Sequence, residues 1–311
     1  MNDSRLINEA KTHIGLVGCG KWGRFILRDL LSLGCKCSVA DLSDPAREEA
    51  ACAGAEEVVR HISDLSESIT GYIVATPATT HYEIVRELLA RGRPIYVEKP
   101  LTDSIDTSAE LARIGTGLLF VMEKWRYHPG IEAMAKIVGS RRYGKLLTLR
   151  CRRVQWNQSQ TDVSPIWTLL PHDLSIVDHI LGQLPSPIWS YVERDDDGTP
   201  LSLSARLDGM ETTVFIEISS LVPIRERKVT LTFEGGTLML EDPLAAELLF
   251  KAAGSKETDP CLGIPISTEQ PLLSELRAFI DYLGGGAPPM TNCARAAQSV
   301  ALIQQLLDMA T

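Results

Sequence analysis

Short apolar runs alternate with stretches of helical periodicity over the first third of the chain. The runs predict strands that are apolar on both faces, at His13–Val17, Cys37–Ala40, Tyr72–Ala75, Ile95–Val97 and Leu118–Met122. Between them, apolar residues recur at the spacing of amphipathic helices, which we predict at Trp22–Leu33, Pro45–Ala53, His81–Arg91 and Asp106–Arg113. Alternation of such strands with helices indicates a doubly wound parallel sheet with helices on both faces.

The pattern changes after about residue 125, where longer strands follow one another with turn residues between them. Alternation of apolar and polar residues predicts strands at Lys145–Trp156, Ile188–Glu193, Ser202–Leu207, Thr212–Ile218, Lys228–Phe233 and Thr237–Leu240. Helical spacing predicts helices at Ile131–Val138, Leu174–Ile180, Leu272–Leu283 and Ala294–Leu307. Residues 251–271 show neither pattern, and we expect an exposed loop there. We therefore predict an α/β first domain (1–124) and an α+β second domain (125–311). The second is built on a large, mostly antiparallel, open-faced sheet, and its C-terminal helix can pack back on the first domain.

Composition narrows the function classes. The 311 residues include 31 basic and 40 acidic side chains, a formal net charge of −9. An acidic chain is unsuited to nucleic acid or to an anionic membrane surface, because both attract basic proteins. No apolar run is long enough to span a bilayer, and the polar start of the chain lacks the apolar core of a signal peptide. Seven cysteines without CxxC spacing predict reduced thiols and a cytoplasmic protein without a metal site.

A glycine-rich turn follows the first predicted strand and precedes the first helix. It consists of Gly18, Cys19, Gly20, Lys21, Trp22 and Gly23. Glycines at this spacing permit a tight bend, let a pyrophosphate approach the backbone and let helix and strand pack closely, while the helix N-terminus offers free N–H groups. Asp41, at the end of the second predicted strand, is placed to accept hydrogen bonds from the adenosine ribose. Its carboxylate would repel a 2′-phosphate, so the pattern predicts a Rossmann domain that prefers NAD over NADP.

Several further stretches match a known family. They are GLVGCGKWG (15–23), VATPATTHYEIVRELLARGRPIYVEKPL (74–101), the RYHP segment (126–129) and PHDLSIVDHILG (171–182). With them the chain resembles the Gfo/Idh/MocA oxidoreductases, which include glucose–fructose oxidoreductase and inositol dehydrogenase, over essentially its whole length. The resemblance implies an NAD(P)-dependent dehydrogenase or reductase. Its reaction would transfer a hydride between the nicotinamide and a secondary alcohol or ketone of a sugar, cyclic polyol or sugar derivative.

Lys99 and His172 are the candidate catalytic residues. Lys99 follows a predicted parallel strand, at the edge where ligands bind in such sheets, and a cis bond to Pro100 would turn its ammonium toward a cleft. His172 has the side chain of a proton donor and acceptor, with an ordinary pKa of about 6.5, and we expect it to open a helix of the second domain. The resemblance implies that the lysine lies near the nicotinamide and hydrogen-bonds the reacting oxygen, whose proton the histidine exchanges.

One position departs from the family pattern. Sugar dehydrogenases of this family usually carry an aspartate four residues before the histidine, where this chain has Thr168. A threonine can hydrogen-bond but cannot hold a charge. This departure leaves open a non-catalytic NAD-binding sensor or regulator.

A second alternative is a nucleotide-sugar or aminosugar dehydrogenase or ketoreductase. A basic cluster motivates it, consisting of Arg141, Arg142, Lys145, Arg150, Arg152 and Arg153. Such a cluster could bind a diphosphate, although a solvated or intersubunit face of the sheet explains it better.

Other residues complete the predicted site. The remaining cofactor candidates are Thr76, Pro77, His81, Glu98 and Lys99, which is also a catalytic candidate. The substrate candidates are Arg126, Tyr127, His128, Trp167, Thr168 and Asp173, of which Asp173 is also a candidate helix cap. We expect Asp178 and His179 to be ordinary helix residues. An uncovered apolar sheet face needs a partner, so we predict a homodimer or homotetramer through the C-terminal sheet, acting on a small sugar-like molecule.

Overall fold

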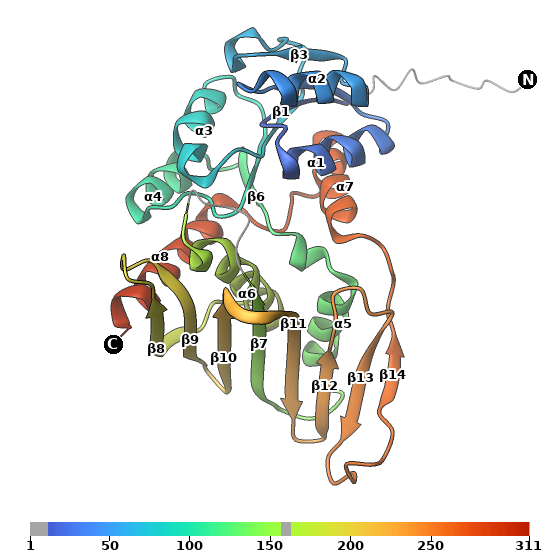
Figure 1. The fold of residues 1–311 in the computed structure, drawn as a ribbon. Coiled ribbons are helices and arrows are strands. Elements are labelled where there is room, and N and C mark those ends of the chain that lie inside the picture. Colours follow the sequence, from blue (N-terminus) through green and yellow to red (C-terminus); the bar gives the residue numbers. More distant parts are fainter. Residues whose placement is uncertain (1–11, 157–162, 311) are drawn as a thin grey trace, which may run out of the picture.

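A computed structural model describes residues 12–156 and 163–310 and arranges them around two sheets (Figure 1). The first sheet is parallel throughout, with the strand order β3-β2-β1-β4-β5-β6. Its strands are β1 (His13–Val17), β2 (Lys36–Ala40), β3 (Glu57–Val59), β4 (Gly71–Val74), β5 (Ile95–Glu98) and β6 (Leu119–Met122). Its helices are α1 (Lys21–Ser32), α2 (Asp44–Ala53), α3 (His81–Leu89) and α4 (Ile105–Ile114). The predicted doubly wound parallel sheet is confirmed, and the short edge strand β3 is an addition to it.

The second sheet has the strand order β14-β13-β12-β11-β7-β10-β9-β8 and is antiparallel except for the β7–β10 pair. Its strands are β7 (Leu146–Trp156), β8 (Ser186–Arg194), β9 (Pro200–Gly209), β10 (Thr212–Ser219), β11 (Leu221–Phe233), β12 (Gly236–Leu240), β13 (Glu247–Ala252) and β14 (Leu262–Pro265). The exposed loop predicted for residues 251–271 is therefore partly wrong, because it contains the end of β13 and all of β14. Only Leu248 and Phe250 of β13 are buried, which is too short an alternation to predict a strand.

Helices cover one face of the second sheet and leave the other open (Figure 1). The covering elements are η3 (Lys124–Tyr127), α5 (Pro129–Gly139) and α6 (Pro165–Leu181). Because side chains alternate between the faces of a strand, the buried residues Cys151 and Arg153 of β7 point toward these helices. Arg150 and Arg152 point to the open face. The predicted open-faced, mostly antiparallel sheet is confirmed.

The last two helices return to the first sheet. Helix α7 (Pro271–Leu283) packs on α1, with Leu276 and Phe279 buried between them. Helix α8 (Cys293–Met309) packs on α4 and also on α6 and β8, so that it lies between the two sheets in Figure 1. A division of the chain near residue 124 remains our proposal, with α7 and α8 joining the later part to the first sheet.

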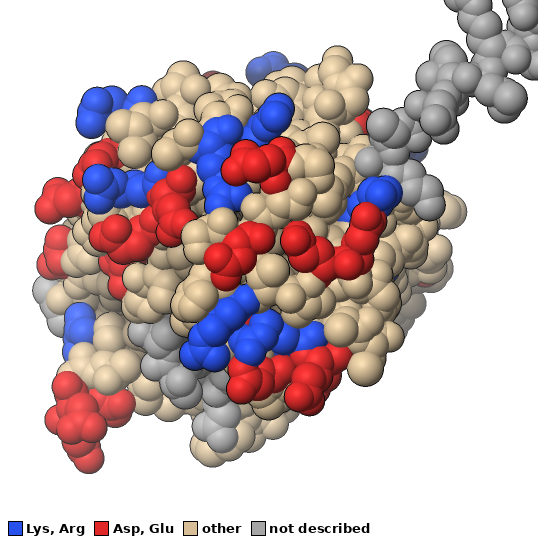
Figure 2. Space-filling model, turned by 90° about the horizontal axis from the view of Figure 1, so that it is seen from above, with Lys and Arg blue, Asp and Glu red and all other residues tan. Residues whose placement is uncertain are grey.

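Charged side chains on the exposed end of the first domain are interspersed rather than segregated. Figure 2 shows Lys and Arg next to Asp and Glu over this face. Three ion pairs of the first domain illustrate the pattern: Arg24–Glu49, Arg47–Asp44 and Lys36–Glu56. In the described part of the chain, no helix has both the length and the apolar character that a membrane span requires.

Candidate active site

A cavity of about 630 Å³ opens at the carboxyl ends of β1 to β4. The strand order reverses between β1 and β4, and doubly wound sheets bind ligands at such a switch point. The predicted cofactor residues in its wall are Gly18, Gly20, Asp41, Thr76 and Pro77. The volume lies within the range of small-molecule sites, about 300–1,000 Å³.

The glycine turn at the cavity fits the pyrophosphate of a dinucleotide. Gly18 has φ +88°, and a Cβ on it would lie 2.8 Å from the Ala75 carbonyl oxygen. A Cβ on Gly23 would lie 2.2 Å from the Gly18 carbonyl oxygen, so both positions need glycine for the turn itself. A Cβ on Gly20 would meet nothing within 4 Å, and Gly20 caps α1 without a side-chain hydrogen bond. Open space before uncapped helix N–H groups is what a bound phosphate requires.

Asp41 lines the cavity and is fixed by the turn. Its carboxylate accepts hydrogen bonds from the backbone N–H of Cys19 (2.6 Å) and of Ser43 (2.8 Å). Arg60 also lines the cavity and lies 3.5 Å from Asp44. Sequence reasoning missed Arg60, because it reaches the cavity from the unpredicted strand β3.

His81 braces the site instead of facing the cavity. Its side chain is 1% exposed, and its ring nitrogens lie 3.0 Å from the carbonyl oxygens of Thr76 and Pro100. Burial lowers the pKa of His81 below its ordinary value. These contacts connect the loop after β4 to the segment after β5, so His81 supports the cavity wall.

Three side chains tie the glycine turn to the end of β5. Trp22 Nε1 donates a hydrogen bond to the Glu98 carboxylate, and Lys124 Nζ lies 4.3 Å from the centre of the Trp22 ring. Burial lowers the pKa of Lys124 to about 8, against the opposing charges of Glu98 and Glu275. The sequence contains no signal for Lys124, whose position follows from the packing of η3 against the first domain.

Lys99 and His172 come together from the two domains. The Lys99–Pro100 peptide bond is cis, and Lys99 Nζ donates a hydrogen bond to the backbone oxygen of Thr168 at 3.1 Å. Thr168 precedes His172 by four residues in α6, so the two occupy the same side of the helix. The ammonium of Lys99 therefore lies one helical turn from His172.

The imidazole of His172 is in a buried, cationic environment. Its Nδ1 is shielded from solvent and has no hydrogen-bond partner among the described residues. Burial lowers its pKa well below the ordinary value, and the positive charges of Lys99, Arg153, Lys124 and Arg227 lower it further. The ring is therefore neutral at pH 7 and can accept a proton.

The prediction that His172 opens its helix is wrong. Helix α6 begins at Pro165 and contains Pro171 in its interior, where a proline donates no backbone hydrogen bond. Asp173 consequently caps nothing. It forms a buried ion pair with Arg153, with Nε–Oδ2 2.5 Å and Nη2–Oδ1 3.3 Å.

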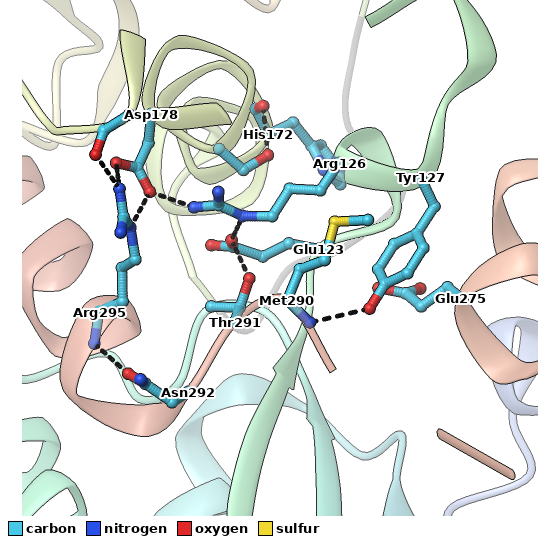
Figure 3. Close-up of polar contacts among 12 residues, drawn as sticks. Glu123, Arg126, Tyr127, His172, Asp178, Glu275, Met290, Thr291, Asn292 and Arg295 are labelled. Carbon is cyan, nitrogen blue, oxygen red and sulfur yellow. Dashed lines mark hydrogen bonds and ion pairs between the residues drawn. The ribbon is translucent and has the colours of Figure 1, made fainter. Parts of the chain in front are cut away.

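A buried ionic network holds α6 against η3 and α8 (Figure 3). The Arg126 guanidinium donates hydrogen bonds to Glu123 and Asp178, Arg295 donates to Asp178, and Thr291 donates to Glu123. Arg126 is thus occupied by the carboxylates of Glu123 and Asp178. Asp178 lies within helix α6, as predicted, and its carboxylate is the acceptor that Arg126 and Arg295 share.

The other substrate candidates have structural partners too. The Tyr127 hydroxyl accepts a hydrogen bond from the Met290 N–H at 3.0 Å (Figure 3). His128 caps α5, its Nδ1 accepting from the Gly130 N–H at 3.0 Å. Trp167 is buried. Thr168 contacts a candidate catalytic residue, because its backbone oxygen accepts a hydrogen bond from Lys99 Nζ.

Comparisons with known proteins agree with the resemblance found in the sequence. Residues 12–116 match the model of the GFO_IDH_MocA family, described as an oxidoreductase family with an NAD-binding Rossmann fold. The chain is 26% identical over 317 residues to inositol 2-dehydrogenase 2 of Paenarthrobacter aurescens, covering 94% of each protein. It is 27% identical over 300 residues to the inositol 2-dehydrogenase of Ralstonia nicotianae, covering 88% of this chain and 86% of that protein. The chain is thus similar to the Gfo/Idh/MocA oxidoreductases, through the family model over its first domain and through these relatives over nearly its whole length.

A solved structure supports the fold of this chain. Levoglucosan dehydrogenase, solved in complex with NADH and L-sorbose, superposes with a TM-score of 0.85 and 14% sequence identity, over 96% of both chains. The predicted resemblance is confirmed, and with it a nicotinamide cofactor for this oxidoreductase.

The predicted basic cluster does not form one site. Arg152 pairs with Glu217 and Glu226 on the open face of the second sheet. Arg150 stacks on the ring of Phe215 on the same face. Arg153 lies on the opposite face, where it pairs with Asp173. The cluster is divided between two faces and partly neutralised, so it gives no support to a diphosphate site.

Proposed function

We propose that the protein is an NAD-dependent dehydrogenase that oxidises a secondary alcohol of a cyclic polyol, sugar or sugar derivative. The observation that carries the proposal is the contact of Lys99, at the end of β5, with α6 one turn from the neutral imidazole of His172. An ammonium donor and a neutral base are the two groups that alcohol oxidation needs. The names of the relatives from Paenarthrobacter and Ralstonia favour a polyol substrate.

Lys99 and His172 act on different atoms of the reacting hydroxyl group: Lys99 on its oxygen and His172 on its proton. The cofactor, when bound, accepts a hydride from the carbinol carbon. The Lys99 ammonium donates a hydrogen bond to the substrate oxygen and stabilises the negative charge that develops there. His172 takes the hydroxyl proton as the carbonyl forms, and the reverse transfer serves reduction. Thr168 needs no charge in this scheme, because its backbone oxygen already orients Lys99.

Turnover tests the proposal against the sensor alternative. The purified protein is incubated with NAD⁺ and a panel of inositols, hexoses and their derivatives, and NADH formation is followed by absorbance. NADH formation with a polyol or sugar supports the dehydrogenase. Tight NAD binding without turnover of any compound would favour a sensor.

The preference for NAD over NADP is proposed from Asp41. Replacement by serine removes the carboxylate that faces the ribose, so Asp41→Ser is expected to lower the NAD/NADP ratio of kcat/KM by about tenfold or more. Arg60, already in the cavity wall, would then favour a 2′-phosphate. Glu48→Ser, at an exposed carboxylate of α2, is the control and should leave the ratio unchanged. An unchanged ratio in Asp41→Ser would remove Asp41 from cofactor selection.

The pH profile of oxidation depends on His172. Only the neutral imidazole accepts a proton, and burial with the surrounding cations lowers its pKa well below 6.5. Activity should therefore persist as the pH falls through 6.5, with the acid limb of kcat/KM well below that value. Initial rates between about pH 5 and 8 check this. A limb at or above the ordinary histidine pKa would contradict it.

The assembly and compartment are also proposals. The open sheet face exposes Trp156, Trp189 and Tyr191 at 61%, 50% and 47% of their surface. Exposed aromatic side chains on a sheet face favour burial against a second copy, so we expect a homodimer or homotetramer. All seven cysteines are free thiols, in keeping with the reducing cytoplasm.

A further inference from the structure

Two arginines lie side by side beneath the candidate catalytic histidine. Arg153 of β7 and Arg227 of β11 are direct partners in the strand register. Residues directly opposite each other in antiparallel strands have side chains on the same face. Both guanidinium groups are therefore on the face that α6 covers, and Arg153 reaches Asp173, the residue after His172.

The two arginines differ in their partners. Arg153 is 2% exposed, forms an ion pair with Asp173 and stacks on the Trp125 ring at 4.7 Å. Arg227 has no ion pair with any described residue. Arg227 Nη2 donates a hydrogen bond to Gln155 Oε1 at 3.4 Å. Among the described residues, Arg153 therefore has a carboxylate in direct contact, and Arg227 has none.

Buried N–H groups without partners point to a missing acceptor. Within the described part of the chain, Arg227 Nε and Arg153 Nη1 are both shielded from solvent and have no hydrogen-bond partner. Leaving such donors unpaired costs free energy, and a partly buried charge without a carboxylate in contact costs more. Burial, together with the charges of Arg153 and Arg225, lowers the pKa of Arg227 to about 10, against the opposing charges of Asp173 and Asp242. An anionic group arriving with a ligand would compensate this charge.

The positive charge of Arg227 acts on the candidate catalytic site. The positive charges of Lys99, Lys124, Arg153 and Arg227 all act on the His172 imidazole. Glu98 bonds to Trp22, on the side of the glycine turn, and Asp173 is held by Arg153. An acidic group on the substrate would therefore balance the excess positive charge around His172.

We propose that the substrate is a polyhydroxylated carboxylic acid, a sugar acid, whose carboxylate is bound by Arg227 beside Arg153. This inference rests on the proposed dehydrogenase function and narrows its substrate class. A carboxylate carries one negative charge, which matches the single uncompensated guanidinium. A phosphate ester carries about −1.5 to −2 at pH 7 and would exceed it. The guanidinium edge suits a carboxylate geometrically as well.

Pairs of sugars that differ only in the acid group test the proposal. Initial rates with NAD⁺ are compared for D-glucose and D-glucuronate, for D-galactose and D-galacturonate, and for D-glucose 6-phosphate. We expect kcat/KM to be at least about tenfold higher for the acids, and Arg227→Gln to remove about tenfold to a hundredfold of this preference. Arg225→Gln, at an exposed position of the same strand, should keep the wild-type ratio. Arg227→Lys, which retains the positive charge, should keep part of the preference for the acids.

A binding measurement separates this inference from the proposed function. Calorimetry of the uronates with the NAD-bound Lys99→Met variant, with and without Arg227→Gln, reports recognition without turnover. Tighter binding of the acids that depends on Arg227 supports the inference even if no sugar of the panel is oxidised. Equal binding and turnover of acids and neutral sugars would overturn it while the dehydrogenase function stands. Preference for glucose 6-phosphate, or an unchanged acid preference in a folded Arg227→Gln variant, would also overturn it.

Discussion

Lys99→Met is expected to reduce NAD-dependent turnover by at least about a thousandfold. Methionine keeps the length and the apolar stem of the side chain but removes the ammonium that holds the Thr168 carbonyl and would polarise the substrate oxygen. The dinucleotide cavity lies at β1 to β4 and does not include Lys99 in its wall, so NADH affinity should change by no more than about threefold, under 1 kcal/mol.

Two measurements check this expectation. Steady-state rates report the loss of turnover, and NADH fluorescence titration reports retention of the cofactor. Lys136→Met is the matched control, because Lys136 is an exposed lysine of α5 that pairs with Glu132 at 3.6 Å. It should be indistinguishable from wild type. Turnover of Lys99→Met within tenfold of wild type would remove Lys99 from the chemistry.

Local sequence signals were sufficient for the nucleotide-binding half of the site. The glycine turn and Asp41 follow predictable strands, and their contacts lie within a single βαβ unit. The residues at the end of β5 could be predicted in the same way, since ligands bind at the carboxyl ends of parallel strands. The meeting of Lys99 with α6, however, joins residues 69 positions apart and was implied only by the family resemblance.

The remaining parts of the site depend on contacts that no local pattern contains. Arg126 was visible as a charged residue after a strand, but its partner Asp178 is 52 positions away, and Asp178 meets Arg295 across 117 positions. Arg227 lies in a strand of alternating charges, where nothing distinguishes a solvated arginine from a buried one. The start of α6 was predicted too late in the chain, because a proline inside a helix, such as Pro171, looks in the sequence like a proline at a helix start.

Asp178→Ala is expected to lower the free energy of unfolding by about 3–5 kcal/mol. Asp178 is 1% exposed and receives Arg126 and Arg295 (Figure 3), so its removal leaves two guanidinium groups without their shared acceptor. Burial alone would raise the pKa of Asp178, but hydrogen bonds and charge from both arginines lower it overall. Its contribution is therefore complete above the carboxylate pKa of the unfolded chain, about 3.9. It is lost as the pH falls through the lower folded value.

Urea unfolding followed by circular dichroism distinguishes a buried network from an exposed pair. Glu49→Ala breaks the exposed pair with Arg24 and should cost no more than about 1 kcal/mol. A similarly small loss for Asp178→Ala would show that the network contributes little to stability. Because Asp178 follows His172 in α6, a large loss would also predict reduced kcat/KM in the fraction that remains folded. The network would then connect the packing of the two domains to the position of His172, because α6 carries both His172 and Asp178. Of the two described acidic side chains of α6, Asp178 pairs with Arg126 of η3 and Arg295 of α8, whereas Asp173 pairs with Arg153 of β7.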